Sequence, residues 1–532
     1  MNEMTELTTE FWFPPAGQLG WFAPELALIA TIVAVVAVPI ILGRRARLSA
    51  CVALLGVVAA LLLTGDVGRR VAEEAAAGLA PPGAPPMLIA DNFAVFFKAF
   101  LLLFLTLVTV LWLFGLTGRR PALARRFAAH SVEFFVLLLG SALGMMVMVS
   151  TLNLLMIILA IELASLPSYA LAGYDKRDPA GAEASLKYVL FGAVTAAITL
   201  YGVSLLYGAF GTLDIPTIAA AMAGGGAGVG AALGLLGLCV GIGFKISAVP
   251  FHFWCPDVFE GATIEVATWL SVASKAAGLG LLLRVVTAMG SLDDALAITV
   301  GIVATATCTL ANFAAYRQQN VKRILAYSSI AHAGYMLMAA AVFVPAASEA
   351  EPNLAASALL LYLLTYLFMN FGVFAATACV EWETGSSALS NFIGLGRRAP
   401  WLAVPMAVCL LSLVGLPPLG GFLAKWWLLV ALGSGAAEHD RLWGLVLVLV
   451  LNTLFSLYYY LRIIYMMFLR TEWSRPAPLA PHVGGLVLVN ACAVVLLLFG
   501  TLGARAVKLL ADEYAVHLYA APLARAAAAL VP

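Results

Sequence analysis

Apolar residues fill most of the chain in long blocks, and polar residues gather in short stretches between them. A helix needs about 20 apolar residues to cross a bilayer. A window of that length predicts helices over 23–42, 49–65, 92–116, 131–150, 152–173, 184–208, 227–249, 264–288, 295–315, 321–344, 356–380, 401–432, 442–469 and 484–503. We therefore expect an all-α polytopic membrane protein with about fourteen transmembrane helices.

Two of these predicted helices are interrupted. The seventh ends near residue 249 and continues beyond Pro250 as a short second half. The twelfth is overlong and contains Leu416-Pro417-Pro418-Leu419-Gly420-Gly421, which predicts two half-helices. Interrupted helices in corresponding places of two halves indicate a repeat with ion sites near the membrane centre. The offset between them is odd, so we predict two inverted five-helix repeats with discontinuous helices 7 and 12.

This arrangement divides the chain into four parts. We predict an N-terminal addition of three helices in residues 1–130, and the first repeat, helices 4 to 8, in residues 131–290. Residues 291–470 form the second repeat, helices 9 to 13, and 471–532 hold helix 14 and a tail.

Basic residues show a preference for one side of the predicted helices. The loops after odd-numbered helices contain Arg44, Arg45, Arg47, Arg119, Arg120, Arg125, Arg126, Lys176, Arg177, Arg317, Arg397, Arg398, Arg470 and Arg475. The loops after even-numbered helices are mainly acidic, with Arg69, Arg70 and Arg441 as exceptions. Cytoplasmic loops are enriched in Lys and Arg. We therefore expect the odd loops in the cytoplasm and both termini on the non-cytoplasmic side.

Composition supports the membrane assignment and excludes several functions. The 532 residues are 63% hydrophobic and 11% charged, against roughly 25% charged in soluble domains. A net charge of +1 and the absence of a basic run give no reason to expect nucleic acid as a partner. The seven cysteines include no Cys-x-x-Cys pair, and there is no Walker A or dinucleotide-binding glycine motif. We expect no cofactor and no metal in this chain.

Ionisable residues within the predicted helices are the main functional candidates: Glu162, Lys187, Lys245, Lys275 and Lys425. Burial makes a lysine release its proton more readily, and a nearby carboxylate holds it charged. A series of such groups can pass protons through a membrane. The alternative is a set of ion pairs that hold helices together. We favour a proton relay, because four lysines exceed what Glu162, the only acid at similar depth, can pair.

Two histidines extend this set. His252 follows Pro250 and is equally well explained as a proton carrier or as a polar cap of the broken helix. A metal site with Cys255 is disfavoured because nothing supplies the remaining ligands. His332 lies in Tyr327-Ser-Ser-Ile-Ala-His-Ala-Gly-Tyr335, a stretch unusually polar for a membrane helix. We therefore expect His332 on a wetted interior face and favour a functional role.

Other charges lie near the ends of predicted helices: Lys98, Glu133, Asp257, Glu260, Glu265, Arg284, Lys322, Arg323 and Arg462. Long side chains there can extend to the membrane interface, which we expect for Lys98, Glu133, Arg284 and Arg462. The three acids after helix 7 are expected to form a solvated rim or an entry site. The positive-inside rule explains Lys322 and Arg323.

The motifs around these residues resemble a known family. They are Glu162-Leu-Ala-Ser-Leu-Pro-Ser-Tyr, Glu183-Ala-Ser-Leu-Lys-Tyr, Gly243-Phe-Lys-Ile-Ser, Pro256-Asp-Val-Phe-Glu-Gly, Val321-Lys-Arg-Ile-Leu-Ala-Tyr-Ser-Ser-Ile-Ala-His-Ala-Gly-Tyr and Leu411-Ser-Leu-Val-Gly-Leu-Pro-Pro-Leu-Gly-Gly-Phe-Leu-Ala-Lys. Together they resemble the N-type antiporter-like subunits of proton-pumping NADH–quinone oxidoreductase, respiratory complex I. The related M type carries a glutamate where this chain has Lys425.

The resemblance implies a proton-translocating subunit without redox chemistry of its own. Glu162 and Lys187 would form the coupling pair, Lys245 and then Lys275 would carry protons inward, and Lys425 would lie on the exit side. Partners would be the lipid bilayer and other membrane subunits of complex I, including a neighbouring antiporter-like subunit. Partner subunits would handle NADH, FMN, iron–sulfur clusters and quinone. The location would be the cell inner (plasma) membrane.

The alternative function is an Mrp-type cation/proton antiporter subunit without redox partners. The sequence also departs from the family pattern in two places. Cys255 stands where threonine is usual, and residues 263–266 replace a proline-containing stretch and add Glu265.

Overall fold

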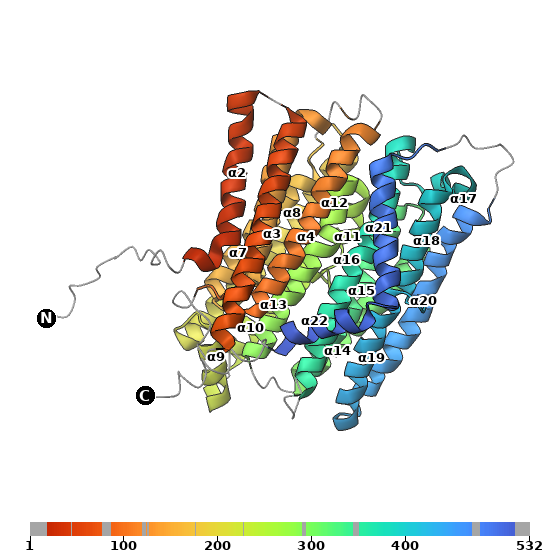
Figure 1. The fold of residues 1–532 in the computed structure, drawn as a ribbon. Coiled ribbons are helices and arrows are strands. Elements are labelled where there is room, and N and C mark those ends of the chain that lie inside the picture. Colours follow the sequence, from red (N-terminus) through yellow and green to blue (C-terminus); the bar gives the residue numbers. More distant parts are fainter. Residues whose placement is uncertain are drawn as a thin grey trace.

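The computed structural model describes residues 19–43, 45–76, 87–119, 124, 127–175, 177–226, 228–289, 294–343, 350–470 and 479–516. Long helices run side by side through most of this structure (Figure 1). The N-terminal part contains η1 (Gly20–Phe22), α2 (Ala23–Leu42), α3 (Ala46–Ala76) and α4 (Asn92–Gly118). The C-terminal part contains α21 (Val483–Gly500) and α22 (Ala504–Val516).

The central part holds two successive groups of helices. The first contains α6 (Ser131–Met148), α7 (Leu154–Ala172), α8 (Pro179–Phe210), α9 (Ile215–Ala221), η2 (Met222–Gly226), α10 (Val229–Ile246), α11 (Trp254–Gly261), α12 (Ile264–Trp269), η3 (Leu270–Ser274) and α13 (Lys275–Ala288). The second contains α14 (Asp294–Ala315), α15 (Val321–Phe343), α16 (Ala350–Thr384), η4 (Leu389–Phe392), α17 (Leu395–Arg398), α18 (Pro400–Val414), α19 (Gly420–Glu438) and α20 (Leu442–Phe468).

Both predicted breaks are present. The first separates α10 from α11, and α10 ends at Ser247 in a left-handed conformation with φ of 63°. The second separates α18 from α19, and α18 ends at Gly415 with φ of 90°. Each break falls in the fourth membrane crossing of its group. The prediction of discontinuous helices 7 and 12 is therefore confirmed.

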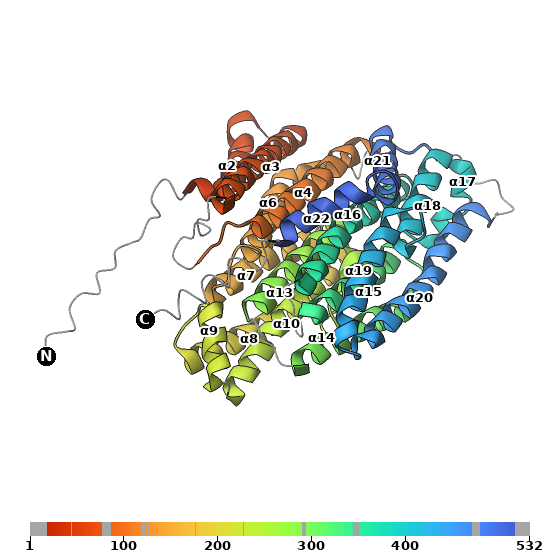
Figure 2. The same ribbon diagram turned by 60° about the horizontal axis from the view of Figure 1, so that its bottom comes forward.

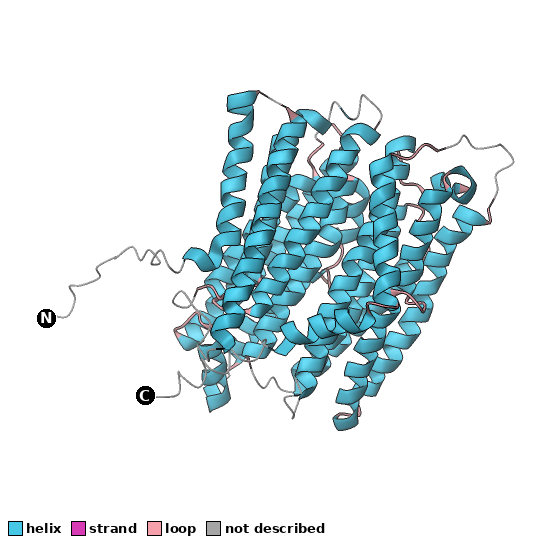
Figure 3. Cartoon of the chain, viewed as in Figure 1, coloured by secondary structure: helices cyan, strands magenta, loops and turns pink. Residues whose placement is uncertain are grey.

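The described residues contain 13 helices long and apolar enough to cross a membrane. The remaining predicted crossing is the broken one, α18 followed by α19. The described residues are otherwise loops and two isolated β-bridges, Asn153 with Asp214 and Asn320 with Ala388 (Figure 3). The prediction of an all-α polytopic membrane protein is confirmed.

The centre of the bundle is the helix formed by α12, η3 and α13. The apolar window of its span, Ile264–Ala288, is 100% buried within the protein. Its neighbours include α4, α6, α10, α15 and α16, and α13 lies among the other helices in the tilted view (Figure 2). The π-helical segment η3 interrupts this helix immediately before Lys275.

Several helices differ from their predicted ranges. The helices α3, α8 and α16 extend beyond the apolar windows that predicted them. Polar residues can continue a helix at the membrane boundary, where a hydropathy window no longer detects it. The helix α22 was not predicted, because its 13 residues are too few and too polar for a membrane crossing. It packs across α16 and α4, toward the lower end of Figure 1.

Some predictions fall outside the described residues. They concern Arg44, Arg120, Arg125, Arg126, Lys176, Arg475 and the two termini, 1–18 and 517–532. The sidedness of the chain therefore stays a prediction.

Candidate functional site

Lys245 lies in the last turn of α10, directly before the first helix break. Its side chain is 1% exposed, and its Nζ has no hydrogen-bond partner among the described residues. The carbonyl oxygen of Lys245 accepts a hydrogen bond of 2.9 Å from Ser274 Oγ. Side chains thus satisfy backbone groups released by the break, as a membrane interior requires. The amine itself can take up or release a proton without breaking a hydrogen bond to the described protein groups.

Lys275 begins α13 immediately after the π-helical segment and is fully buried. Its Nζ lies 3.8 Å from Cys255 Sγ, and it lies 5.2 Å from the centre of the Phe259 ring. Cys255 Sγ is 3.9 Å from Ser329 Oγ. The cysteine that departs from the family pattern is therefore a direct polar neighbour of Lys275 and connects it to α15.

Lys425 lies in α19, just after the second break, and is buried. Its Nζ donates a hydrogen bond of 2.9 Å to the carbonyl of Val414, the last residue of α18. It also lies 5.0 Å from the centre of the Tyr335 ring. Gly421 allows the two half-helices to meet, because a Cβ there would lie 1.8 Å from the Ser412 carbonyl oxygen. Lys425 is therefore held at the second break by a hydrogen bond, whereas Lys245 lies at the first break with its amine unpartnered among the described residues.

His332 lies between these two lysine sites, in the buried helix α15. Its Nδ1 is 2.8 Å from the Tyr362 hydroxyl, and its Nε2 is 3.2 Å from the Tyr460 hydroxyl. Ser329 lies one helical turn before His332, and Tyr335 lies one turn after it. The structure thus places His332 between Ser329, which lies beside Cys255, and the Tyr335 ring, which lies beside Lys425. Tyr362 and Tyr460 were missed by sequence reasoning, and the run Tyr458-Tyr-Tyr460 was the only visible signal for Tyr460.

Lys187 is less deeply placed than the sequence predicted. Its side chain is 39% exposed, so the expectation of a buried lysine is wrong. Its Nζ lies 2.7 Å from Glu183 Oε1 and 2.8 Å from Asp257 Oδ2, and these, rather than Glu162, are its ion-pair partners. The long helix α8 begins eight residues before Lys187, and its first turns are partly exposed.

Glu162 lies on α7 and is half-buried. It lines a cavity of about 350 Å³ with Tyr169, Ser185 and apolar residues of α7 and α8. The structure therefore places Glu162 and Lys187 on adjacent helices but does not join them in an ion pair.

His252 lies in the loop between the two halves of the first broken helix. It lines a cavity of about 320 Å³ together with Lys187, Asp257, Arg323 and apolar residues. Asp257 bridges this cavity, because its two carboxylate oxygens each lie 2.8 Å from a cation, Lys187 Nζ and Arg323 Nη1. Asp257 was assigned only to a rim or entry site in the sequence. Asp257 is partly exposed at this cavity, and His252 lies on the cavity wall.

Three charges expected at the interface or on a solvated rim are buried instead. Lys98 Nζ lies 2.7 Å from Glu25 Oε1. Arg284 forms two hydrogen bonds to Asp91, of 2.6 and 2.5 Å. Glu265 is fully buried and pairs with Arg119 at 2.5 Å. The predictions for Lys98, Arg284 and Glu265 are wrong, because neighbouring helices from distant parts of the chain cover these helix ends.

The remaining charged residues near helix ends differ in how exposed they are. The Lys322 side chain is largely buried and donates to the Ala262 carbonyl at 2.9 Å, so its expected surface position is wrong. Arg323, Asp257 and Glu260 are partly exposed and form one group of ion pairs. Arg462 donates to the carbonyls of Tyr316 and Gln318. Glu133 is exposed.

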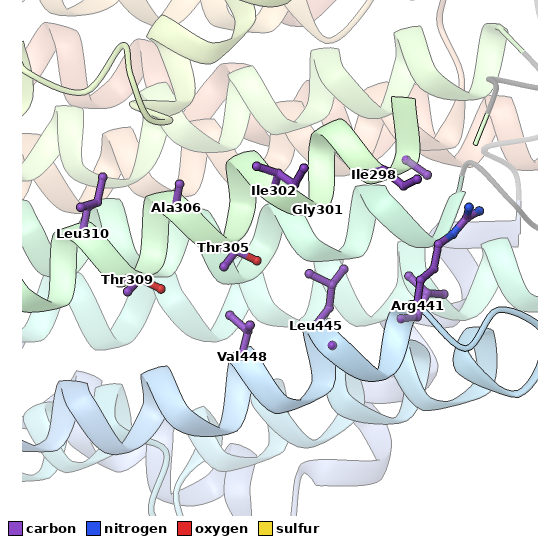
Figure 4. Close-up of a pocket in the computed structure, with 13 residues that line it drawn as sticks. Ile298, Gly301, Ile302, Thr305, Ala306, Thr309, Leu310, Arg441, Leu445 and Val448 are labelled. Carbon is purple, nitrogen blue, oxygen red and sulfur yellow. The ribbon is translucent and has the colours of Figure 1, made fainter. Parts of the chain in front are cut away.

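A groove of about 640 Å³ lies between α14 and α20, away from the relay residues (Figure 4). Its lining is mostly apolar, and Thr305, Thr309 and Arg441 are its polar members. A water path for protons needs more polar groups than this wall offers. We therefore do not include the groove in the candidate site.

Residues 150–456 match the protein family described as NADH:quinone oxidoreductase/Mrp antiporter, TM. The chain belongs to this family. It is 39% identical over 495 residues to NADH-quinone oxidoreductase subunit N 2 of Sorangium cellulosum (strain So ce56), covering 90% of this chain and 94% of that relative. It is 37% identical over 518 residues to subunit N of Anaeromyxobacter sp. (strain Fw109-5), covering 90% and 93%. The resemblance to the N type is confirmed.

Solved structures of the family have the same fold. A chain of respiratory complex I from Thermus thermophilus with bound aureothin superposes with a TM-score of 0.72 at 32% identity, covering 91% of this chain and 98% of that one. A chain of the Mrp complex from Dietzia sp. DQ12-45-1b gives a TM-score of 0.78 at 20% identity, covering 94% and 98%. The second likeness shows the fold alone.

Proposed function

We propose that this chain is a membrane subunit of NADH–quinone oxidoreductase that translocates protons and performs no redox chemistry itself. The subunit N relatives and the similar chain in a complex I structure support this proposal. Quinone reduction in other subunits would drive the translocation. The proposed relay consists of Glu162, Lys187, Lys245, Lys275, His332 and Lys425, with His252 as an accessory.

The observation that carries the proposal is the surroundings of the three buried lysines. A structural ion pair would require an acid in contact with each lysine. Instead, Lys245 Nζ has no hydrogen-bond partner among the described residues. Lys275 lies beside a thiol and aromatic rings, and Lys425 is bonded to a backbone carbonyl. Buried lysines with neutral neighbours are better suited to transferring protons than to joining helices by ion pairs.

A polar connection across the bundle supports a route between the two broken helices. Lys275 is close to Cys255, which is close to Ser329 of α15. From the next turn of that helix, His332 contacts the Tyr460 hydroxyl, and Tyr335 lies against Lys425. Small rearrangements of side chains and internal water can complete a path along these groups.

The entry side lies at the ion pairs of Lys187, where Asp257 and His252 line a cavity. Glu162 belongs to an outward face of α7 whose exposed residues are Leu155, Leu159, Leu163 and Leu166. A carboxylate on such a face needs a cover, because lipid does not solvate it. We therefore assign this face to a neighbouring antiporter-like subunit, which would enclose Glu162 and let its charge respond across the interface.

The rest of the proposal concerns location and organisation. The chain lies in the cell inner membrane with both termini on the non-cytoplasmic side, as the Arg and Lys distribution favours. Its parts are 1–130, 131–290, 291–470 and 471–532. NADH, FMN, iron–sulfur clusters and quinone are bound by partner subunits. Within the described residues, no group of three or more His, Cys, Asp or Glu could hold a metal ion.

The test uses inverted membrane vesicles, in which NADH oxidation and proton uptake are followed together. We expect Lys245→Ala and Glu162→Gln to lower proton uptake, whereas the exposed control Arg69→Ala leaves both activities intact. Unchanged pumping rate and stoichiometry in both test variants would refute the relay. Sodium-dependent proton exchange without any dependence on NADH would favour the Mrp-type alternative.

A further inference from the structure

The buried pair of Arg119 and Glu265 lies at the end of the bundle where α4 ends and α12 begins. Arg119 Nη2 lies 2.5 Å from Glu265 Oε1, and the Arg119 guanidinium lies 3.8 Å from the centre of the Phe127 ring. Gly115 leaves room for the pair. A Cβ there would lie 2.5 Å from Arg119 Nη1, 3.1 Å from Glu265 Oε1 and 3.1 Å from Trp382 Cζ2. Three side chains from three helices therefore converge at Gly115.

Each of these side chains has a buried polar atom without a partner among the described residues. The atoms are Glu265 Oε2, Arg119 Nη1 and Trp382 Nε1. Two of them are donors and one is an acceptor. Internal waters typically make about three hydrogen bonds to otherwise unsatisfied buried groups. The chemistry of the three atoms therefore fits one internal water, with Thr263 Oγ1 as a further unpartnered group nearby in sequence.

Polar residues continue from this point along the central helix. Thr268, Ser271 and Ser274 follow Glu265 at intervals of three residues, and all are buried. Ser271 Oγ accepts a hydrogen bond of 2.7 Å from Asn370 Nδ2, and Asn370 Oδ1 has no partner among the described groups. Lys275 comes directly after Ser274, at the end of the π-helical segment. Such segments occur frequently at functional sites.

We propose that Arg119, Glu265 and Trp382 hold an internal water and open a second proton route to Lys275. It starts at the end of the bundle where α17 also lies (Figure 1). Glu265 and Lys275 are ten residues apart, about 15 Å along a helix, so the hydroxyls and further waters must relay the proton. Glu265 accepts it on Oε2, and the neutral amine of Lys275 receives it. Glu265 then returns to the carboxylate form beside Arg119.

This inference rests on the proposed function, because it requires Lys275 to carry protons. It is separate from the cavity at Lys187 and His252, which lies beside α8 and α11. It also assigns a role to Glu265, the acid that is added where residues 263–266 depart from the family pattern. The competing explanation is a salt bridge that only fastens α12 to α4. That explanation predicts neither a bound water nor an effect on proton movement.

Hydroxyl-radical footprinting of the intact membrane complex tests for the water. Radicals formed from internal waters oxidise the side chains next to them. Trp382 is 2% exposed, and its control is Trp269, which is also buried but donates to Ser141 Oγ. We expect Trp382 to be oxidised faster than Trp269. Equal oxidation of the two tryptophans would overturn the water site.

Proton uptake per NADH oxidised in inverted vesicles tests the route, with Glu265→Gln and Lys275→Met compared. We expect both variants to lose proton uptake. The loss should be smaller in Glu265→Gln, because protons can still enter the relay at the cavity beside Lys187. If Lys275→Met loses uptake and Glu265→Gln retains all of it, the second route is wrong and the proposed function stands. If neither variant loses uptake, the proposed function fails and the route fails with it.

A double variant distinguishes loss of the proton route from loss of folding. Arg119→Met combined with Glu265→Leu removes both charges, so no unpaired buried charge remains. We expect this double variant to assemble, to lose the extra oxidation of Trp382 and to lose the same share of proton uptake as Glu265→Gln. Retention of wild-type oxidation and uptake in the assembled double variant would overturn the proposal.

Discussion

Arg284→Met is expected to destabilise the folded protein strongly, because it leaves a buried carboxylate without its cation. The Arg284 side chain is 1% exposed and donates to both carboxylate oxygens of Asp91, at 2.6 and 2.5 Å. Its Nε also donates to the Val149 carbonyl at 2.8 Å. Breaking a buried ion pair by removing one partner costs about 3–5 kcal/mol. We expect a loss of that size for Arg284→Met.

Two comparisons make this prediction specific. Adding Asp91→Asn removes the unpaired charge and keeps an N-cap for α4, where Asp91 accepts from the Ala94 amide. The double variant should therefore recover to within about 1–2 kcal/mol of the wild type, since removing both charges is often nearly neutral. Arg70→Met, at an exposed pair with Asp66, should change stability by less than about 1 kcal/mol.

The assay is unfolding by SDS with a thiol-reactive fluorophore as reporter. Cys255, Cys308, Cys379, Cys409 and Cys492 are free and buried, so they react when the bundle opens. Cys51 is exposed and gives the folded baseline. If Arg284→Met unfolds at the same SDS fraction as Arg70→Met, the reasoning about this buried pair is refuted.

Three further predictions follow from single contacts. Gly421→Ala should prevent close approach at the second break and reduce the yield of folded protein, whereas Gly433→Ala, which faces open space, should not; equal yields would contradict this. Asn312→Leu removes the hydrogen bonds to Tyr335, Tyr459 and Asn452 and should lower the free energy of unfolding by about 1–3 kcal/mol in the SDS assay. The control is Thr453→Val, which removes a hydrogen bond within one helix. Equal stability of the two variants would refute the reasoning. Tyr362→Phe removes the hydroxyl beside His332 Nδ1 and should slow proton uptake in a folded protein, so full uptake would argue against His332 as a carrier.

The membrane-crossing helices and their two breaks were predictable because they depend on local sequence. A run of apolar residues must form a helix in lipid, and the Pro-Pro-Leu-Gly-Gly stretch must interrupt one. The same depth argument identified Lys245, Lys275 and Lys425, all of which are buried. These predictions required no knowledge of which helices are neighbours.

The buried ion pairs were not predictable in this way. Arg284 and Asp91 are 193 residues apart, and Arg119 and Glu265 are 146 apart. Hydropathy along the chain shows that these residues lie near helix ends, but not that other helices cover those ends. Lys187 was misjudged in the opposite sense, because α8 begins outside the apolar window that contained it. Side-chain partners from distant helices therefore decide which charges are buried.

The backbone conformation of the central helix was also not predictable from the sequence. Nothing in Leu270-Ser-Val-Ala-Ser274 marks the π-helical segment that the structure shows within this fully buried span. The segment directly precedes Lys275, whose Nζ lies 3.8 Å from Cys255 Sγ. The sequence predicted that Lys275 carries protons, and the structure supplied its neighbours.

The most direct test of the central claim is the number of protons taken up per NADH oxidised by Lys275→Met in inverted vesicles. Methionine keeps the length and apolar stem of lysine but carries no proton, so the packing against Phe259 can remain. A relay through Lys275 predicts a lower ratio of protons to NADH than in the wild type. An unchanged ratio in the assembled variant would contradict the account.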